Sequence, residues 1–316
     1  MDSRRGLIIK AQSGFFQVEA DDTSEIVQCR LRGRLMEAAQ ASAIAAIGDR
    51  VVFSMNEDGT GAIEAVEARH SAVSRAMRTS GPRGAGSPER EQVLIANADQ
   101  ALFVFAAAQP APNPRTIDRF LVMGEKAGLD RLQIVLNKSD LDADGSARAL
   151  MARYEAIGYP VLCTSAVTGA GLDELRMMLK DKISVFTGPS GVGKTSLLNQ
   201  LEPGLGRAVK QVSRYHQEGQ HTTRDSELVR LSFGGYLADT PGMRTLMIWD
   251  VEPEELDAYF PEMAAQAPRC RFAADCAHRT EPGCAVRASV EAGQIARSRY
   301  ESYLALREEL DEAFAL

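Results

Sequence analysis

The sequence predicts an α/β protein in which a small β-barrel precedes a helix-covered parallel sheet, and a small, mostly α-helical unit follows it. Three observations support this division. The first seventy residues contain five short β-type runs, residues 93–250 alternate apolar strands with helices, and three of the five cysteines fall within fifteen residues of the C-terminal part. At 316 residues, the chain is long enough for several units with separate cores.

Residues 1–70 carry the barrel pattern. Short runs rich in β-branched and aromatic residues are separated by Gly and Asp turns, and they read GLIIKA, GFFQVEA, EIVQCRLRG, DRVVFSM and GAIEAVEA. Five strands in so short a stretch suit an OB-fold. An SH3-like barrel or a plain antiparallel module fits the pattern nearly as well.

Residues 71–92 differ from their flanks because they are rich in Gly, Ser, Pro and Arg, which predicts a linker. From residue 93 the pattern changes. The runs ALFVFAAA (101–108) and LQIVLN (132–137) are almost continuously apolar, as expected of parallel strands covered on both faces. An amphipathic stretch at helical spacing lies between them. We therefore expect an α/β domain over 93–250 and a separate unit over 251–316.

The run GPSGVGKT (188–195) fits the pattern of a phosphate-binding loop, with an apolar strand before it and a helix after it. The glycines let backbone N–H groups face phosphate oxygens, and the helix N-terminus adds a favourable dipole. Lys194 should reach the β- and γ-phosphates, and Thr195 should place its hydroxyl on Mg²⁺. The expected nucleotide contacts of this loop are Gly188, Ser190, Gly191, Val192, Gly193, Lys194, Thr195 and Ser196.

A guanine-reading site is indicated by NKSD (137–140) and TSA (164–166), each of which follows a predicted strand. The Asp140 carboxylate can accept from guanine's ring N–H and exocyclic amine, a donor pair that adenine lacks. Asn137 can bond the purine, and the stem of Lys138 can cover its face. Ser165 and Ala166 supply the loop that touches the guanine oxygen, so the expected ligands are GTP and GDP.

DTPG (239–242) and GQHTTRD (219–225) complete the set. Asp239 can hold Mg²⁺ through water, and the Gly242 N–H can meet the γ-phosphate. A threonine in the second run can cover Mg²⁺ when the γ-phosphate is present, with Thr223 the first choice and Thr222 the second. All five GTPase elements are therefore present in the order 4-5-1-2-3, which predicts a circularly permuted GTPase domain.

Hydrolysis requires a group that orients water, and many small GTPases use a glutamine just after the D-x-x-G run. Met243 occupies that position, and a methionine side chain cannot orient water. His221, beside the switch threonines, is the nearest candidate, and a surface loop histidine is the alternative. We expect His221, Thr223 and Lys194 to serve catalysis, with slow turnover that a partner stimulates.

The run CRFAADCAHRTEPGC predicts a metal site with the ligands Cys270, Cys276, His278 and Cys284. Three thiolates and an imidazole suit one tetrahedral Zn²⁺, and because no general acid or base accompanies them, the ion would be structural. Reduced, unliganded thiols are the alternative.

Charge and composition bear on partners. The net charge is −7, but five arginines fall between residues 69 and 90, and Arg30, Arg32 and Arg34 alternate along a predicted strand. Solvated surface is the simple interpretation, while their presence in a GTP-binding chain favours RNA. With no apolar run of membrane-spanning length and no signal peptide, we expect a cytoplasmic monomer without membrane or DNA partners.

The permuted order, GQHTT, DTPG followed by a hydrophobic residue, and CxH followed by EPGCAV together resemble the RsgA family of GTPases. The resemblance covers nearly the whole chain and includes ANADQALFVFAA (96–107) and FLVMGEKAG (120–128). It implies an N-terminal OB-fold, a permuted GTPase domain and a C-terminal zinc domain. It also implies late maturation of the small ribosomal subunit, hydrolysis stimulated by that subunit, contacts with ribosomal RNA and a catalytic role for His221.

Two departures from the family pattern are visible. Five residues separate Cys270 and Cys276 where the family pattern has four, and Arg224 replaces the third threonine of the switch. A GTP-gated RNA-binding module with incidental hydrolysis is the main functional alternative. A signalling or trafficking GTPase is disfavoured by the barrel and the cysteine cluster.

Overall fold

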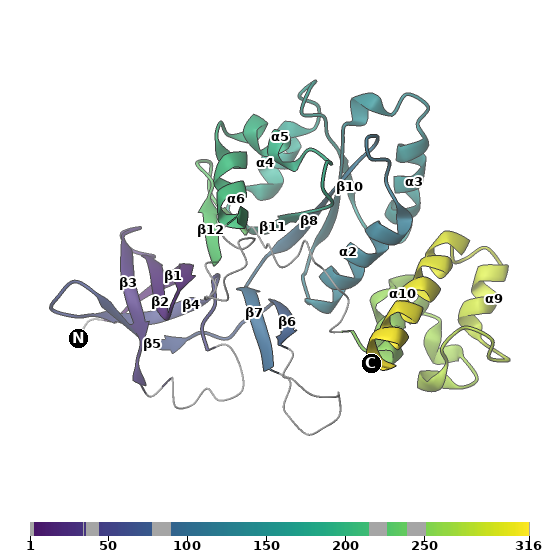
Figure 1. The fold of residues 1–316 in the computed structure, drawn as a ribbon, viewed down its shortest axis with the longest axis horizontal. Coiled ribbons are helices and arrows are strands. Elements are labelled where there is room, and N and C mark those ends of the chain that lie inside the picture. Colours follow the sequence, from purple (N-terminus) through teal and green to yellow (C-terminus); the bar gives the residue numbers. More distant parts are fainter. Residues whose placement is uncertain are drawn as a thin grey trace.

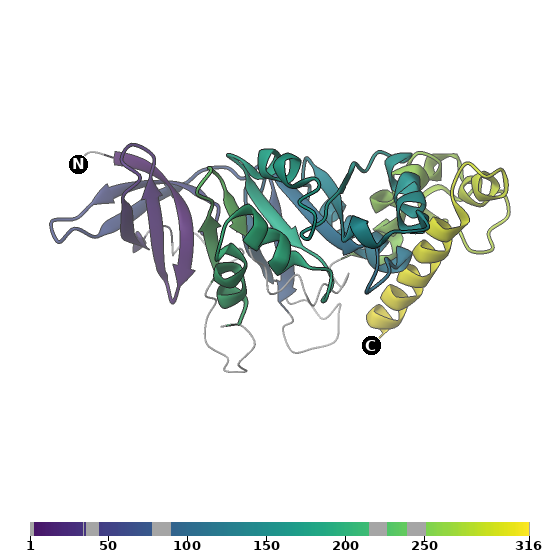
Figure 2. The same ribbon diagram turned by 90° about the horizontal axis from the view of Figure 1, so that it is seen from above.

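The computed structural model describes residues 3–33, 35, 44–77, 90–214, 226–238 and 251–315. Its three parts lie in a row: a β-barrel at one end, a sheet flanked by helices in the middle, and a helical module at the other end (Figures 1 and 2).

The N-terminal part is a closed five-stranded barrel. Its strands are β1 (Ser3–Gln12), β2 (Phe15–Ala20), β3 (Ile26–Leu31), β4 (Arg50–Met55) and β5 (Gly61–Val66). They follow each other around the barrel in the order β1-β2-β3-β5-β4, and β4 pairs with β1 to close it. The pairing of β3 with β5 is parallel and the others are antiparallel. This confirms the predicted barrel and gives it the OB-like arrangement.

The expected linker contains strands at both ends. β6 (Ala72–Met77) and β7 (Arg90–Ala96) form a two-stranded antiparallel sheet. Val73 and Ile95 are buried, and the N–H of Ala96 donates to the carbonyl of Ile47 at 2.9 Å. The Gly, Ser and Pro residues of 78–89 dominated the sequence pattern, and they lie outside the described residues.

The central sheet has the order β10-β9-β8-β11-β13-β12. Its strands are β8 (Gln100–Ala106), β9 (Leu132–Asn137), β10 (Val161–Cys163), β11 (Ile183–Thr187), β12 (Ser226–Arg230) and β13 (Tyr236–Ala238). All neighbouring pairs are parallel except β12–β13. If the strand before the predicted phosphate loop is counted first, the order becomes 6-5-4-1-3-2. The permutation therefore changes where the chain enters the sheet and leaves the arrangement of the strands intact.

Helices cover both faces of this sheet, as alternation along β8 shows. Phe103 and Phe105 pack on the side of α2 (Pro114–Lys126) and α3 (Ser146–Glu155). Leu102 and Val104 pack on the opposite side, against a second group of helices. That group comprises α4 (Leu172–Leu179), α5 (Lys194–Leu201) and α6 (Leu205–Arg214). A two-sided apolar strand therefore belongs to a doubly covered parallel sheet, as predicted.

The C-terminal module consists of short helices around one core. Its elements are η2 (Pro253–Tyr259), α8 (Pro261–Ala264), η3 (Ala267–Arg269), η4 (Ala273–Asp275), α9 (Ala285–Glu291) and α10 (Arg297–Ala315). Phe260 and Tyr303 pack edge to face at its centre, with ring centroids 5.6 Å apart. Val122 of α2 belongs to the same buried cluster, so the module packs on the central α/β domain through α2.

None of the helices among the described residues combines the length and the apolar character needed to cross a membrane.

Candidate nucleotide site and candidate metal centre

The predicted phosphate loop joins the end of β11 to the start of α5. Gly188 is buried, and a Cβ added to it would lie 2.1 Å from the carbonyl oxygen of Val104 on β8. Gly193 has φ +91°, and a Cβ there would lie 2.4 Å from Nδ2 of Asn137. Side chains at either position would push the loop away from the neighbouring strands, which explains why glycine occupies both.

Lys194 and Asn137 hold this loop from two sides. Nζ of Lys194 donates to the carbonyls of Gly188 and Pro189, both at 2.6 Å. Nδ2 of Asn137 donates to the carbonyl of Val192 at 2.8 Å. The expected guanine reader is thus bonded directly to the expected phosphate loop, although about fifty residues separate them in the sequence.

The two predicted base-reading loops also meet. Oγ of Ser165 donates to the Asp140 carboxylate at 2.5 Å, and the N–H of Ser139 donates to the carbonyl of Thr164 at 3.1 Å. Ser165 is buried, whereas Asp140 is exposed. The bond fixes the orientation of the Asp140 carboxylate and leaves acceptor capacity for a ligand's donors.

One contact was not foreseen from the sequence. Nζ of Lys138 donates to the carbonyl of Gly191 at 2.8 Å and to that of Gln109. Gln109 follows β8 with φ +51°, so the loop after β8 joins the phosphate loop and the base reader at one edge of the sheet. The available signal was the proline-containing loop after a central parallel strand, because such loops meet at that edge.

Five other predicted site residues lie outside the described residues: His221, Thr222, Thr223, Asp239 and Gly242. Thr195 and Ser196 do belong to the described first turn of α5. The two segments that contain these five residues flank the hairpin of β12 and β13 in the sequence, because β12 begins at Ser226 and β13 ends at Ala238.

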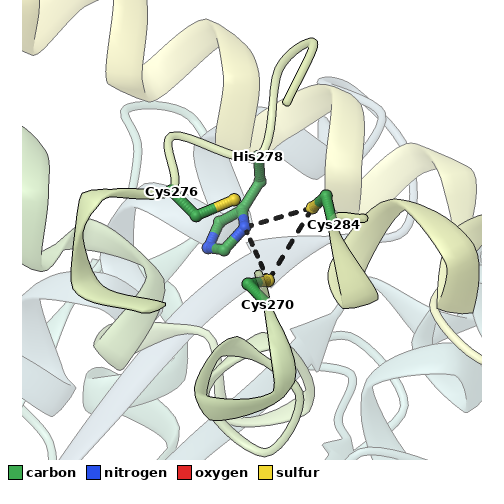
Figure 3. A group of neighbouring side chains, drawn as sticks. All are labelled: Cys270, Cys276, His278 and Cys284. Carbon is green, nitrogen blue, oxygen red and sulfur yellow. Dashed lines mark hydrogen bonds between the residues drawn. The ribbon is translucent and has the colours of Figure 1, made fainter. Parts of the chain in front are cut away.

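The predicted metal ligands come together in the C-terminal module (Figure 3). Cys270, Cys276, His278 and Cys284 are all buried, and their ligand atoms lie within 4.8 Å of one another. Nδ1 of His278 is 3.6 Å from Sγ of Cys270 and 3.4 Å from Sγ of Cys284, and these two sulfurs are 3.9 Å apart. A tetrahedral zinc ion requires about 3.6 Å between nitrogen and sulfur and about 3.8 Å between sulfurs, so the cluster has the dimensions to hold zinc.

The surroundings of the sulfurs also suit thiolate ligands. The N–H of Ala285 points at Sγ of Cys270 at 3.3 Å, and the N–H of Arg287 points at Sγ of Cys284 at 3.4 Å. Burial tends to raise the pKa of Cys270, but the N–H groups of Val286 and Ala285 outweigh it and the pKa is lowered. Burial raises the pKa of Cys276 to about 12. A metal ion bound here would take the place of the thiol proton at Cys276.

The additional residue between Cys270 and Cys276 is accommodated locally. The segment forms the 3-10 turn η4, and Ala273 adopts φ +44°. Both cysteines still reach the cluster, so the longer spacing does not prevent Cys270 from contributing a ligand atom.

A family model described as RsgA GTPase matches residues 66–249, and one described as RsgA N-terminal domain matches residues 5–63. The chain belongs to the RsgA GTPase family. A small ribosomal subunit biogenesis GTPase RsgA of Gemmatimonas aurantiaca is 42% identical over 310 residues, which are 98% of each chain. A Thermotoga maritima protein of the same name is 41% identical and covers 97% of each chain.

Two solved structures of RsgA-like proteins agree over almost the whole chain. The crystal structure of YjeQ from Thermotoga maritima has a TM-score of 0.77 at 36% identity and covers 98% of this chain and 99% of its own. That of YloQ, titled a circularly permuted GTPase, has a TM-score of 0.74 at 31% identity, with coverage of 98% and 96%. The predicted permutation and the predicted GTP hydrolase activity are thereby confirmed at the level of the family.

Proposed function

We propose that this protein hydrolyses GTP during late maturation of the small ribosomal subunit and that the subunit stimulates the reaction. The observation that carries the proposal is the hydrogen bond from Asn137 to Val192, which joins the predicted guanine reader to the predicted phosphate loop in a permuted order. The full-length relatives, named small ribosomal subunit biogenesis GTPases, supply the process. On this proposal the protein works in the cytoplasm, as a monomer, on the subunit and its RNA.

We assign the nucleotide contacts as the sequence predicts them. Backbone N–H groups of Gly188 and of the stretch from Ser190 to Ser196 would hold the phosphates, and Asp140 would accept from guanine. Thr195 and Thr223 would ligate Mg²⁺, with Asp239 acting through water, and the ion would neutralise charge developing on the phosphates. His221 would orient the attacking water, while Lys194 would stabilise the γ-phosphoryl group.

The cysteine cluster is assigned one structural Zn²⁺. The module around it is small, and a bound ion would tie together η3, the loop after η4 and the start of α9. We retain the division at 1–70, 71–92, 93–250 and 251–316 as a proposal about independent units, although β6 and the first residues of β7 lie within the 71–92 segment.

The outer face of the barrel supports an RNA partner. Cζ of Arg30 lies 4.1 Å from the ring centroid of Phe15, and Arg30 is exposed. An aromatic ring beside a guanidinium, on strands β2 and β3, offers a nucleobase both stacking and charge. Two other arginines of the basic clusters have structural partners: Arg69 is paired with Asp49 and Arg32 with Glu64, each at 2.7 Å.

Two substitutions test the assignment of roles. Lys194→Ala should abolish GTP binding, whereas Lys182→Ala, an exposed lysine paired with Asp99, should leave it intact. His221→Ala should retain GTP binding and lose turnover. If His221→Ala turned over GTP at the parental rate, the catalytic assignment would be wrong, and the GTP-gated RNA-binding module would become the better account.

A further inference from the structure

We propose that Glu19 of the barrel is a positioning residue for the nucleotide site and that it raises the preference for GTP over GDP. The inference rests on the proposed function, because it concerns the γ-phosphate contacts assigned above. Its structural basis is the hairpin of β12 and β13, which lies between the two switch segments in the sequence and against the barrel in space (Figure 1).

The barrel and the GTPase sheet form one continuous sheet at this hairpin. β1 pairs antiparallel with β12, with Lys10 opposite Glu227 and Ala11 opposite Ser226. The other half of β1 closes the barrel against β4. A single strand is therefore bonded to the barrel wall and to the edge of the sheet that carries the switches.

Side chains strengthen this junction at three points. Nζ of Lys10 lies 2.8 Å from the Glu227 carboxylate. The two oxygens of Glu19 are shared, one accepting from Arg230 at 2.7 Å and the other from the hydroxyl of Tyr236 at 2.8 Å. Arg230 is the last residue of β12 and Tyr236 the first of β13, so Glu19 holds both strands at the turn end of the hairpin.

The burial of Glu19 shows that the hairpin covers it. Along β2, Phe16 and Val18 point into the barrel, and alternation places Glu19 outward with Gln17. Gln17 is exposed, whereas Glu19 is only 7% exposed. The buried Glu19 carboxylate is therefore held by charge-assisted hydrogen bonds, which are stronger than hydrogen bonds between neutral groups.

The ends of the hairpin connect this junction to the nucleotide. Thr223 lies three residues before β12, and Asp239 follows directly after β13. Both segments are assigned contacts near the γ-phosphate, which GDP lacks. If the hairpin is held in place, the segments that contain Thr223 and Asp239 start from fixed positions. Such preorganisation favours GTP, because only GTP has the γ-phosphate that both segments are proposed to contact.

The test compares the dissociation constants of a non-hydrolysable GTP analogue and of GDP for the full chain and its variants. Glu19→Ala and Tyr236→Phe should each weaken the analogue at least about fivefold, the lower end of usual coupling between sites, and change GDP less than about twofold. Tyr236→Phe removes one hydroxyl, so it gives a result even if Glu19→Ala does not fold.

Glu64→Ala is the matched control. Its carboxylate accepts from Arg32 at 2.7 Å and from Ser54 at 2.8 Å within the barrel, away from the hairpin. It should leave the ratio of the two constants unchanged. An unchanged ratio in Tyr236→Phe, or an equal shift in Glu64→Ala, would overturn the inference. A parent chain that binds neither nucleotide would instead refute the proposed function.

Discussion

The carboxylate of Asp257 lies 3.1 Å from Nε2 of His278, while Nδ1 of the same ring faces the cysteine sulfurs. This arrangement assigns Nδ1 to a metal ion and the Nε2–H to the carboxylate, which fixes both tautomer and ring orientation. Asp257 belongs to η2, whereas the cysteines follow it in the sequence. The first helix of the C-terminal module is therefore tied to the metal centre by a carboxylate–histidine pair.

Asp257→Asn should weaken zinc binding by about 10- to 100-fold, because an amide orients the imidazole less well and adds less to its basicity. Competition with a chromophoric chelator measures the affinity directly. Asp311→Asn is the control, since Asp311 pairs with the partly exposed Arg279 of the same module at 2.5 Å and does not contact a ligand residue. Equal zinc affinities in both variants would contradict the role of Asp257.

Asp140→Asn should change the base that the protein prefers. On the proposed assignment, the Asp140 carboxylate accepts from two guanine donors, and an amide can accept from only one of them. Loss of a hydrogen bond to a charged group lowers affinity about 10- to 150-fold. Xanthine carries a carbonyl where guanine has its amine, so the amide NH₂ can donate to it and XTP should bind better than GTP. Retention of GTP preference in nucleotide competition would refute the guanine-reader assignment.

Arg299 should be critical for docking the C-terminal module. It bonds Asp118 of α2 and Glu262 of α8, both at 2.6 Å, and is only 4% exposed. These carboxylates overcome the effect of burial and raise the pKa of Arg299. Removing one partner of a buried ion pair costs about 3–5 kcal/mol, so Arg299→Ala should lower the free energy of unfolding by that amount.

Arg119→Ala provides the comparison for Arg299, because Arg119 also joins the module to α2 but pairs with a half-exposed glutamate, Glu309. Exposed pairs contribute about 0–1 kcal/mol. Denaturant unfolding of both variants measures the difference, and losses of similar size would contradict a special role for the buried network.

Stability at alkaline pH should depend on Cys29. Burial in the barrel raises the pKa of this thiol to about 11. Because the pKa in the unfolded chain is lower, the contribution of Cys29 is complete below the unfolded pKa and is lost as pH rises toward 11. In Cys29→Ala, the free energy of unfolding should fall less steeply between pH 9 and 10.5, by at most about 1.4 kcal/mol per pH unit. Identical slopes would show that the thiol ionises equally in both states.

The sequence predicted the loops that directly follow strands far better than contacts between distant side chains. GPSGVGKT and NKSD each follow an apolar run, and parallel strands bring such loops to one edge, so their junction followed from order alone. The pairings of Glu19 with Arg230 and of Asp118 with Arg299 join residues 211 and 181 positions apart. Charged residues of this kind are common on surfaces, and nothing local marks these four as buried partners.

Two other features illustrate the same limit. β6 was not predicted because its neighbours favour turns, and Val73 gains its burial only from contact with the rest of the protein. The barrel topology could not be selected from five strands, because the parallel pairing of β3 with β5 depends on residues far apart in the chain.

We propose that a maturing or mature small ribosomal subunit stimulates GTP hydrolysis by this protein. The most direct test of this stimulation is the hydrolysis rate of the full chain alone, with purified small subunits, and with large subunits as control. We predict slow turnover alone, a large increase with small subunits and little change with large subunits. An unchanged rate with small subunits, under conditions where the protein binds GTP, would contradict the account.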